Sequence, residues 1–121
     1  MSKLQISVRI KIHDGMLEAF KKKVSECILR VKDKDSGTIQ YDWFLSNDKR
    51  ECEIRETYES SKAFLAHLSN VSDTLETLFE KFATVDSVAI YGDPSPELLK
   101  RAAARAGVPL KIYSILQGLD T

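Results

Sequence analysis

The sequence predicts an α+β fold, and three observations support this prediction. Polar and apolar residues alternate strictly near the start of the chain, which is typical of a half-buried strand. Apolar residues then recur at three- and four-residue steps, which is typical of an amphipathic helix. Strand-like and helix-like segments continue to alternate further along the chain. We therefore expect a sheet with helices packed against it.

The first half of the chain predicts a strand, a helix and a hairpin. Residues 4–12 are the expected strand, with apolar side chains at every second position. Asp14 is the expected cap of an amphipathic helix over residues 17–31. Two strand-like runs, 39–45 and 51–58, flank a short polar turn. This spacing predicts that the two strands pair as a hairpin.

The middle of the chain predicts two short helices and a fourth strand. Residues 60–68 offer serine caps at the start of a short helix. A second helix, over residues 70–82, is expected to begin at Asn70 or Ser72. Residues 85–91 are rich in β-branched side chains and predict a strand. The resulting β-α-β-β-α-β order predicts a ferredoxin-like arrangement, with two helices packed on one face of an antiparallel sheet.

The last segment predicts one more helix and one more strand. Ser95 is the expected helix cap, Pro96 the first helical residue, and Gly107 the end of the helix. Ala106 is expected on the apolar side of this helix, and residues 110–116 form the expected final strand. The ferredoxin-like order is therefore expected to carry a C-terminal helix-strand extension.

Length and composition limit the possible classes of protein. A chain of 121 residues has the length of one domain, with an expected core over residues 3–92 and an extension over 93–121. Eighteen basic residues balance eighteen acidic ones, so we expect no nucleic-acid or membrane partner. No signal-peptide pattern and no long apolar run is present in the sequence. A cytoplasmic location is expected.

Sequence motifs for metals and nucleotide cofactors are missing. Cys27 and Cys52 do not form a C-x-x-C pair, and the sequence contains neither H-x-x-x-H nor H-E-x-x-H. Neither of the glycine-rich phosphate-binding patterns, G-x-G-x-x-G and G-x-x-x-x-G-K, occurs. We expect no metal site and no bound cofactor.

The predicted sheet also suggests a partner. A ferredoxin-like unit covers one face of its sheet with helices, and a second copy of the chain often covers an open face or edge. We therefore expect a homodimer formed through the sheet face. Gln5, Ser7 and Arg9 make one face of the first strand polar, which a monomer would also tolerate.

Three stretches of the sequence resemble motifs of a known family. They are Asp14-Gly15 ahead of Leu17-Glu18-Ala19-Phe20, then Ser36-Gly37-Thr38-Ile39-Gln40-Tyr41-Asp42, and Glu56-Thr57-Tyr58-Glu59-Ser60 leading to Ala66-His67-Leu68. In order and spacing they are similar to antibiotic biosynthesis monooxygenase-like domains of the dimeric α+β barrel superfamily. The resemblance covers residues 4–91.

This resemblance implies a dimer whose two sheets pack into a barrel, with an apolar cavity between the sheet and helices of each subunit. Members of the family include monooxygenases that oxidise quinol-like aromatics without a cofactor, haem-degrading enzymes, and isomerases of small carbonyl compounds. Tyr58 stands where the family usually has tryptophan. The first strand also lacks the asparagine of the haem-degrading branch, so haem is disfavoured.

The resemblance directs attention to His67 as a catalytic residue. A neutral imidazole could accept a proton from a phenol or enol. The alternative is a histidine at the core boundary that bonds a backbone carbonyl. Tyr58 is the second catalytic candidate, while Tyr41, Trp43 and Phe64 are candidates for shaping a pocket around a planar substrate. Core packing would explain these aromatic residues equally well.

The functional expectation is a cofactor-independent monooxygenase that oxidises a small quinol-like or polyphenolic substrate with molecular oxygen. Two alternatives remain open at this point. One is a non-catalytic ligand-binding or stress-associated dimeric module that uses the same cavity. The other is a cofactor-free isomerase of a small carbonyl compound.

Overall fold

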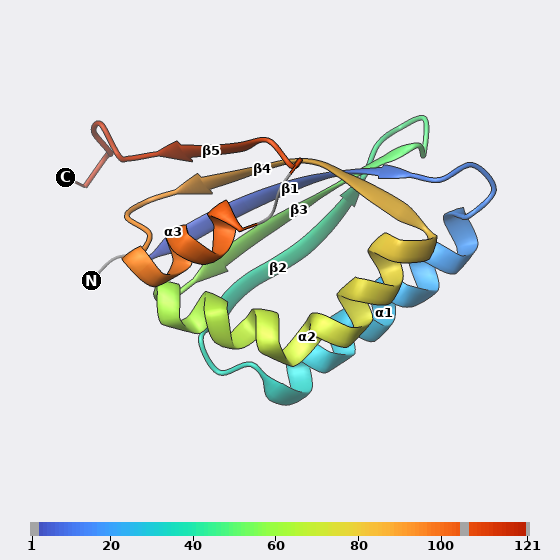
Figure 1. The fold of residues 1–121 in the computed structure, drawn as a ribbon, viewed down its shortest axis with the longest axis horizontal. Helices are drawn as coiled ribbons and strands as arrows, with labels where there is room; N and C mark the ends of the chain where they lie inside the picture. The colour runs from blue at the N-terminus through green and yellow to red at the C-terminus, as the bar shows by residue number, and fades with distance from the viewer. Residues whose placement is uncertain (1–2, 105–106, 121) are drawn as a thin grey trace.

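The expected fold is confirmed by a computed structural model that describes residues 3–104 and 107–120. A βαββαβ core is followed by a helix and a strand (Figure 1). The elements in chain order are β1 (Leu4–Ile12), α1 (Leu17–Lys34), β2 (Thr38–Leu45), β3 (Glu51–Tyr58), α2 (Ser61–Lys81), β4 (Ala83–Tyr91), α3 (Pro96–Ala103) and β5 (Leu110–Tyr113).

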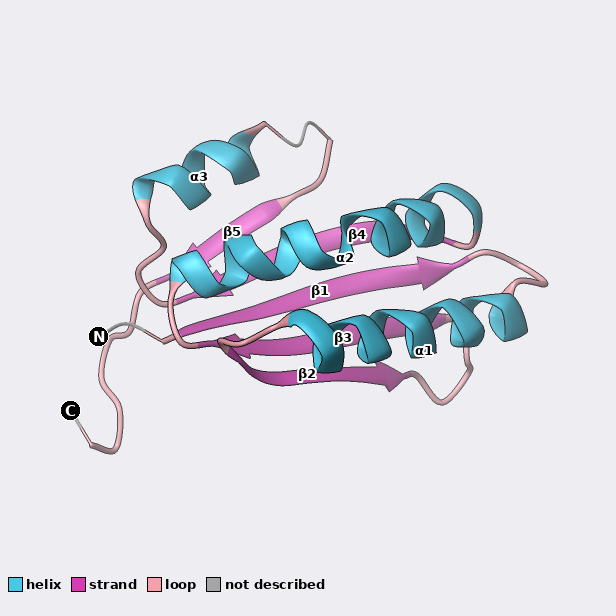
Figure 2. Ribbon diagram, turned by 90° about the horizontal axis from the view of Figure 1, so that it is seen from below, coloured by secondary structure: helices cyan, strands magenta, loops and turns pink. Residues whose placement is uncertain are grey.

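The strands form one mixed sheet in the order β2-β3-β1-β4-β5. All neighbours are antiparallel except β4 and β5, which run parallel because α3 forms the crossover between them. The expected hairpin of β2 and β3 is confirmed. The helices lie on the same side of the sheet, with α1 and α2 side by side and α3 next to the β4–β5 edge (Figure 2).

The strand register places side chains of the central strands in rows across the sheet. Tyr41 of β2 pairs with Glu56 of β3, which pairs with Ile6 of β1, which in turn pairs with Ile90 of β4. Side chains of directly paired residues point to the same face, and Ile6 and Ile90 belong to the buried core. Glu56 is therefore a carboxyl group that faces the helices from within an apolar row.

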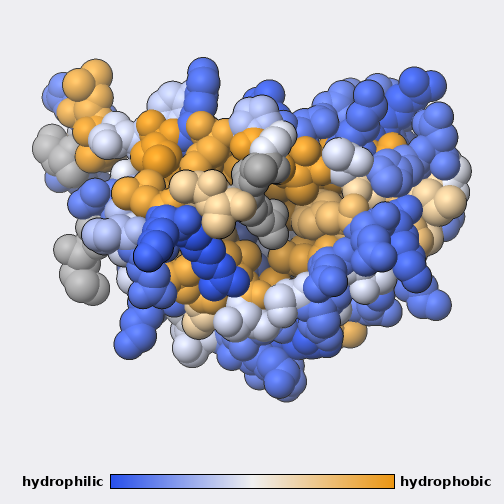
Figure 3. Space-filling view, viewed as in Figure 1, coloured by the Kyte–Doolittle hydropathy of each residue, from blue (hydrophilic) through white to orange (hydrophobic). Residues whose placement is uncertain are grey.

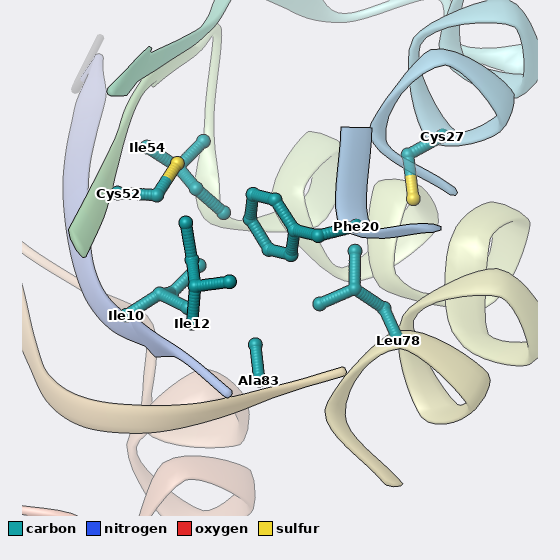
Figure 4. Packing of buried hydrophobic residues seen from close by; sticks show 8 residues of the cluster. All are labelled: Ile10, Ile12, Phe20, Cys27, Cys52, Ile54, Leu78 and Ala83. Atoms are coloured by element: carbon teal, nitrogen blue, oxygen red, sulfur yellow. The ribbon is translucent and has the colours of Figure 1, made fainter. Parts of the chain in front are cut away.

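The core under α1 and α2 is built from the apolar stripe that the sequence predicts. Phe20 and Cys27 of α1 and Leu78 of α2 are buried against apolar side chains of the sheet. Figure 4 shows this cluster: Ile10, Ile12, Phe20, Cys27, Cys52, Ile54, Leu78 and Ala83. These side chains fill the space between the sheet and the two helices in this part of the molecule.

The prediction of two short helices after the hairpin is wrong. A single helix, α2, runs from Ser61 to Lys81. The expected cap at its start is confirmed, because the Ser60 hydroxyl accepts a hydrogen bond from the Ala63 backbone N–H. No glycine or proline interrupts the polar stretch in the middle, so the helix continues through it. Asn70, instead of starting a helix, donates a hydrogen bond from its side-chain amide to the Asp35 carboxylate.

Other boundaries also differ from expectation. Asp14 does not cap α1: Met16 occupies the cap position without a side-chain cap bond, after a turn in which Gly15 has φ 78°. In the extension, the Ser95 cap and Pro96 at the helix start are confirmed. The final strand ends at Tyr113, earlier than expected. Ala106, expected on the apolar side of α3, lies outside the described residues.

Candidate functional site

A cavity of about 900 Å³ lies between the sheet, α2 and the C-terminal extension. Its walls are chiefly apolar, and the polar groups deepest within it are Glu56, His67 and Tyr41. In the space-filling view, apolar side chains surround a hollow over the middle of this face (Figure 3). A concave apolar site with a few convergent polar groups is the usual form of a small-molecule site.

His67 is presented to the cavity by α2. Its ring is only 1% exposed, and it lines the cavity wall. The Nδ1 atom lies 2.7 Å from Asp35 Oδ2, and the Nε2 atom lies 3.9 Å from Glu56 Oε1. Burial lowers the pKa of His67, although the hydrogen bond and charge of Asp35 act in the opposite direction. The alternative of a boundary histidine bonded to a backbone carbonyl does not match these contacts.

Asp35 fixes the orientation of the imidazole from the other side. It follows the last residue of α1, and its side chain is only 3% exposed. Burial raises its pKa, but hydrogen bonds from Thr38, Asn70 and His67 outweigh this and hold the pKa below its usual value. Asp35 is therefore an ionised acceptor, so His67 Nδ1 carries the hydrogen and Nε2 keeps its lone pair.

Glu56 is the second buried carboxyl group at the cavity. Burial raises its pKa to about 7, the hydrogen bond from Tyr58 lowers it, and the nearby negative charge of Asp35 raises it further. The Tyr58 hydroxyl donates a hydrogen bond to Glu56 Oε1. Near neutral pH this group can therefore exchange a proton in either direction, which is the property of a general acid or base.

The expected aromatic residues are distributed around this centre. Tyr58 is fully buried and packs against Phe64 and His67, with ring centroids 4.9 Å and 5.2 Å away, but it does not line the cavity. Phe64 does line the cavity, and its ring is stacked on His67 at 6.1 Å. Tyr58 thus supports the polar centre from behind, while Phe64 forms part of the wall.

Tyr41 lines the cavity, whereas Trp43 lies outside it. The Tyr41 ring meets His67 edge-on at 4.8 Å, and Trp43 packs against Tyr41 and Phe20. The Tyr41 hydroxyl and the Trp43 indole N–H are buried close together without reaching hydrogen-bond geometry, and neither has another partner in the described part of the chain. Burial raises the pKa of Tyr41, so its phenol keeps its proton at neutral pH.

The described residues offer no metal site. Within 3–104 and 107–120, no three histidine, cysteine or acidic side chains are placed so that they could hold a metal ion. The same ranges contain no helix that is long and apolar enough to cross a membrane.

Sequence reasoning missed both carboxyl groups of the site. The sequence did contain a signal for Glu56. In β3, Ile54, Glu56 and Tyr58 occupy alternate positions, so the Glu56 side chain is expected to point inward with the other two. Asp35 gave no such signal. It looks like any acidic residue at a helix end, and its role depends on the contact between its loop and α2.

Comparison with solved structures finds the same fold in other proteins. MupZ from Pseudomonas fluorescens is 21% identical with a TM-score of 0.79, covering 97% of this chain and 93% of its own. SnoaB, a cofactor-independent oxygenase from Streptomyces nogalater, is 11% identical with a TM-score of 0.66, covering 78% of this chain and 96% of its own.

A candidate antibiotic biosynthesis monooxygenase from Nitrosomonas europaea is also similar in structure. It is 19% identical with a TM-score of 0.65, and the match covers 78% of this chain and 92% of that protein. No curated protein matches this chain in sequence. A family model described as antibiotic biosynthesis monooxygenase matches residues 5–84. The chain therefore belongs to the antibiotic biosynthesis monooxygenase family.

Proposed function

We propose that this protein is a cofactor-independent monooxygenase that oxidises a small quinol-like or polyphenolic substrate with molecular oxygen. The observation that carries the proposal is the pairing of His67 with Asp35 at the wall of a large apolar cavity. Family membership supports the same class of reaction. The residues assigned to the reaction are His67 and Glu56, with Tyr58, Tyr41 and Phe64 around them.

His67 is assigned the role of general base. With Nδ1–H donated to Asp35, the Nε2 lone pair is free to take the proton of a phenol bound in the cavity. Burial lowers the pKa of His67, so the ring is neutral and able to accept that proton. Asp35 acts as a positioning residue, since it holds the ring and stabilises the imidazolium that forms.

Deprotonation makes a ring carbon of the substrate electron-rich enough to reduce oxygen. That carbon adds O₂, and the resulting peroxide takes the proton held by His67 to become a hydroperoxide. Neutral His67 then removes the hydrogen of the same carbon as a proton while the O–O bond breaks with loss of water, and finally returns a proton to Glu56. One oxygen atom stays on the substrate as a carbonyl, the other leaves as water, and the substrate loses two hydrogens. Protonation of the departing hydroxide needs an acid, and Glu56, with a pKa of about 7, is the group we assign to that step.

The aromatic residues are assigned to binding and support. Tyr41 carries a buried hydroxyl without a hydrogen-bond partner in the described chain, so it is suited to donate to a substrate oxygen. Phe64 offers a face for a planar ring. Tyr58 holds Glu56 in place through its hydrogen bond, and Trp43 supports Tyr41 from behind.

The test is an oxygen-consumption screen with a panel of quinols, aromatic diols and polyphenols. The wild type should consume oxygen with at least one of them, and His67→Gln should lower kcat by roughly 10²- to 10⁴-fold. His13→Gln is the matched control, because His13 is exposed and does not itself line the cavity. A wild type that consumes no oxygen with any compound, or a His67→Gln variant with full activity, would refute the assignment.

A cofactor-free isomerase is the second candidate, and one observation favours it. His67 Nε2 and Glu56 Oε1 stand 3.9 Å apart at the same cavity, so a base and an acid could act on one carbonyl compound in turn. Such an enzyme would exchange a substrate C–H for deuterium in D₂O without oxygen. Deuterium exchange under nitrogen, lost in Glu56→Gln, would favour this reading over the oxygenase. A non-catalytic binding module would show neither activity.

We further propose that the protein is a homodimer formed through the open face of its sheet. The helices cover the opposite face (Figure 2). On the open face, Phe44 is 54% exposed and Tyr91 is 40% exposed, and both line a shallow hollow of about 460 Å³. Exposed aromatic side chains beside polar ones are typical of interface surfaces.

A further inference from the structure

The cavity is much larger than a single aromatic ring needs. An apolar cavity of about 150 Å³ is enough to hold benzene, whereas this one measures about 900 Å³. It follows β4 from Ile90 to Thr84, which at roughly 3.3 Å per residue is a path of roughly 20 Å. A one-ring substrate placed against His67 would leave most of this volume empty.

The C-terminal extension builds the far wall of the cavity. The lining residues are Leu98 and Ala102 of α3, Val108 ahead of β5, and Leu110 at the start of β5. The family match ends at residue 84, so this wall lies outside the segment that defines the family. The extension thus adds apolar space that the matched segment does not supply.

This wall is anchored to the core. Leu98 is 2% exposed and packs with Leu4, Ile6 and Ile90. The Ser95 backbone N–H donates to the Ser61 hydroxyl at the start of α2, with a distance of 2.9 Å. Displacing a wall that is packed in this way would cost free energy. The wall can therefore select ligands by their shape.

The charges around the cavity show where it opens to water. Glu56 lies inside, while the other charged side chains that line it, Glu76 and Glu80 of α2 and Arg101 of α3, are exposed. The polar centre and the charged rim are therefore separated by an apolar stretch. An elongated ligand would have its reactive group at one end of this stretch and could reach solvent at the other.

We infer that the substrate is elongated, with a reactive ring at His67 and Glu56 and an apolar substituent that lies along α3, so that the extension determines specificity. This inference rests on the proposed function, because it assigns the same cavity to the substrate. Ala102 is the key position: its small side chain leaves the room that the substituent would occupy.

The test measures binding of n-alkyl hydroquinones, from methyl to octyl, by titration calorimetry in the absence of oxygen. In the wild type, each added methylene should tighten binding by roughly threefold to fourfold until the cavity is filled. Ala102→Phe should leave the methyl compound unaffected and weaken the octyl compound by roughly tenfold or more. Ala103→Phe is the matched control, since Ala103 is exposed on the same helix and does not line the cavity.

The outcomes separate this inference from the proposed function. Affinity that does not change with chain length, or equal effects of Ala102→Phe and Ala103→Phe, would overturn the inference even if quinols are oxidised. Graded binding without oxygen consumption would uphold the inference and refute the oxygenase. Val108→Phe, which fills the cavity from the opposite segment, repeats the test if Ala102→Phe fails to fold.

Discussion

The buried carboxyl group of Glu56 should make stability depend on pH. Its pKa of about 7 in the folded protein exceeds the value of 4.5 expected when the chain is unfolded, so the folded state holds the proton more tightly. The contribution of Glu56 to the free energy of unfolding is greatest below pH 4.5 and is lost as the pH rises to 7. Glu56→Gln removes this dependence while keeping an acceptor for the Tyr58 hydroxyl.

Urea denaturation at several pH values measures this effect. Relative to the wild type, the free energy of unfolding of Glu56→Gln should rise by about 3 kcal/mol between pH 4.5 and pH 7. Glu59→Gln is the control, at an exposed position just after β3. Its free energy of unfolding should change with pH in the same way as that of the wild type. Parallel curves for Glu56→Gln as well would show that the carboxyl group is not held in the buried environment described here.

At the residue scale, the sequence pointed to the candidate histidine but not to the two carboxyl groups beside it. His67 stood out through its motif, and Tyr41 and Phe64, selected as candidates for the pocket, do line it. The charge pattern of the site arises from three segments that meet only in the folded chain: the end of α1, the middle of β3, and α2. No spacing rule joins Asp35 to residues 56 and 67, so this part of the site required the structure.

At the element scale, Gly37 controls how the loop before β2 approaches α2. A Cβ atom at this position would lie 2.5 Å from the Ala63 Cβ, which is too close for two carbon atoms. The Gly37 carbonyl also accepts a hydrogen bond from the Glu59 backbone N–H. Because Asp35 is two residues earlier, a shift of this loop would also move the group that orients His67.

Gly37→Ala should therefore lower the free energy of unfolding by about 1 to 3 kcal/mol. Combining it with Ala63→Gly removes the clash, so the double variant should be more stable than the sum of the two single effects predicts. Thermal and urea unfolding of all four proteins gives this coupling. Additive effects would mean that the loop moves aside freely and that the contact with α2 is not tight.

The elements themselves were predictable where periodicity was strong. The strand β1 and the helix α1 follow from alternation and from three- and four-residue steps, and β4 from its β-branched residues. The caps of α2 and α3 were identified from serines. Polar residues in the middle of α2 suggested a break, yet they are tolerated because the apolar face continues through Val71 and Leu78. Asp14 looked like a cap, but the turn at Gly15 places the helix start beyond it.

At the scale of the whole molecule, the two faces of the sheet have different roles. One face and its helices form the walls of the cavity, so every residue assigned to the proposed site comes from a single chain. The other face carries exposed aromatic side chains among polar ones, including Phe44 and a stacked pair, Tyr91 and Tyr113, with ring centroids 5.1 Å apart. The proposed dimer therefore buries the open face of β2 and β3, the strands whose other face carries Tyr41 and Glu56.

Light scattering coupled to gel filtration tests the dimer directly. At micromolar concentration the wild type should have the mass of two chains of 13.7 kDa each. Phe44→Lys places a charge in the proposed interface and should raise the dimer dissociation constant by roughly tenfold or more. Leu29→Lys changes an apolar residue of α1 that is 64% exposed on the helix side, and it should leave the dimer intact. A wild type with the mass of one chain, or a loss of dimer in Leu29→Lys but not in Phe44→Lys, would exclude assembly through the sheet.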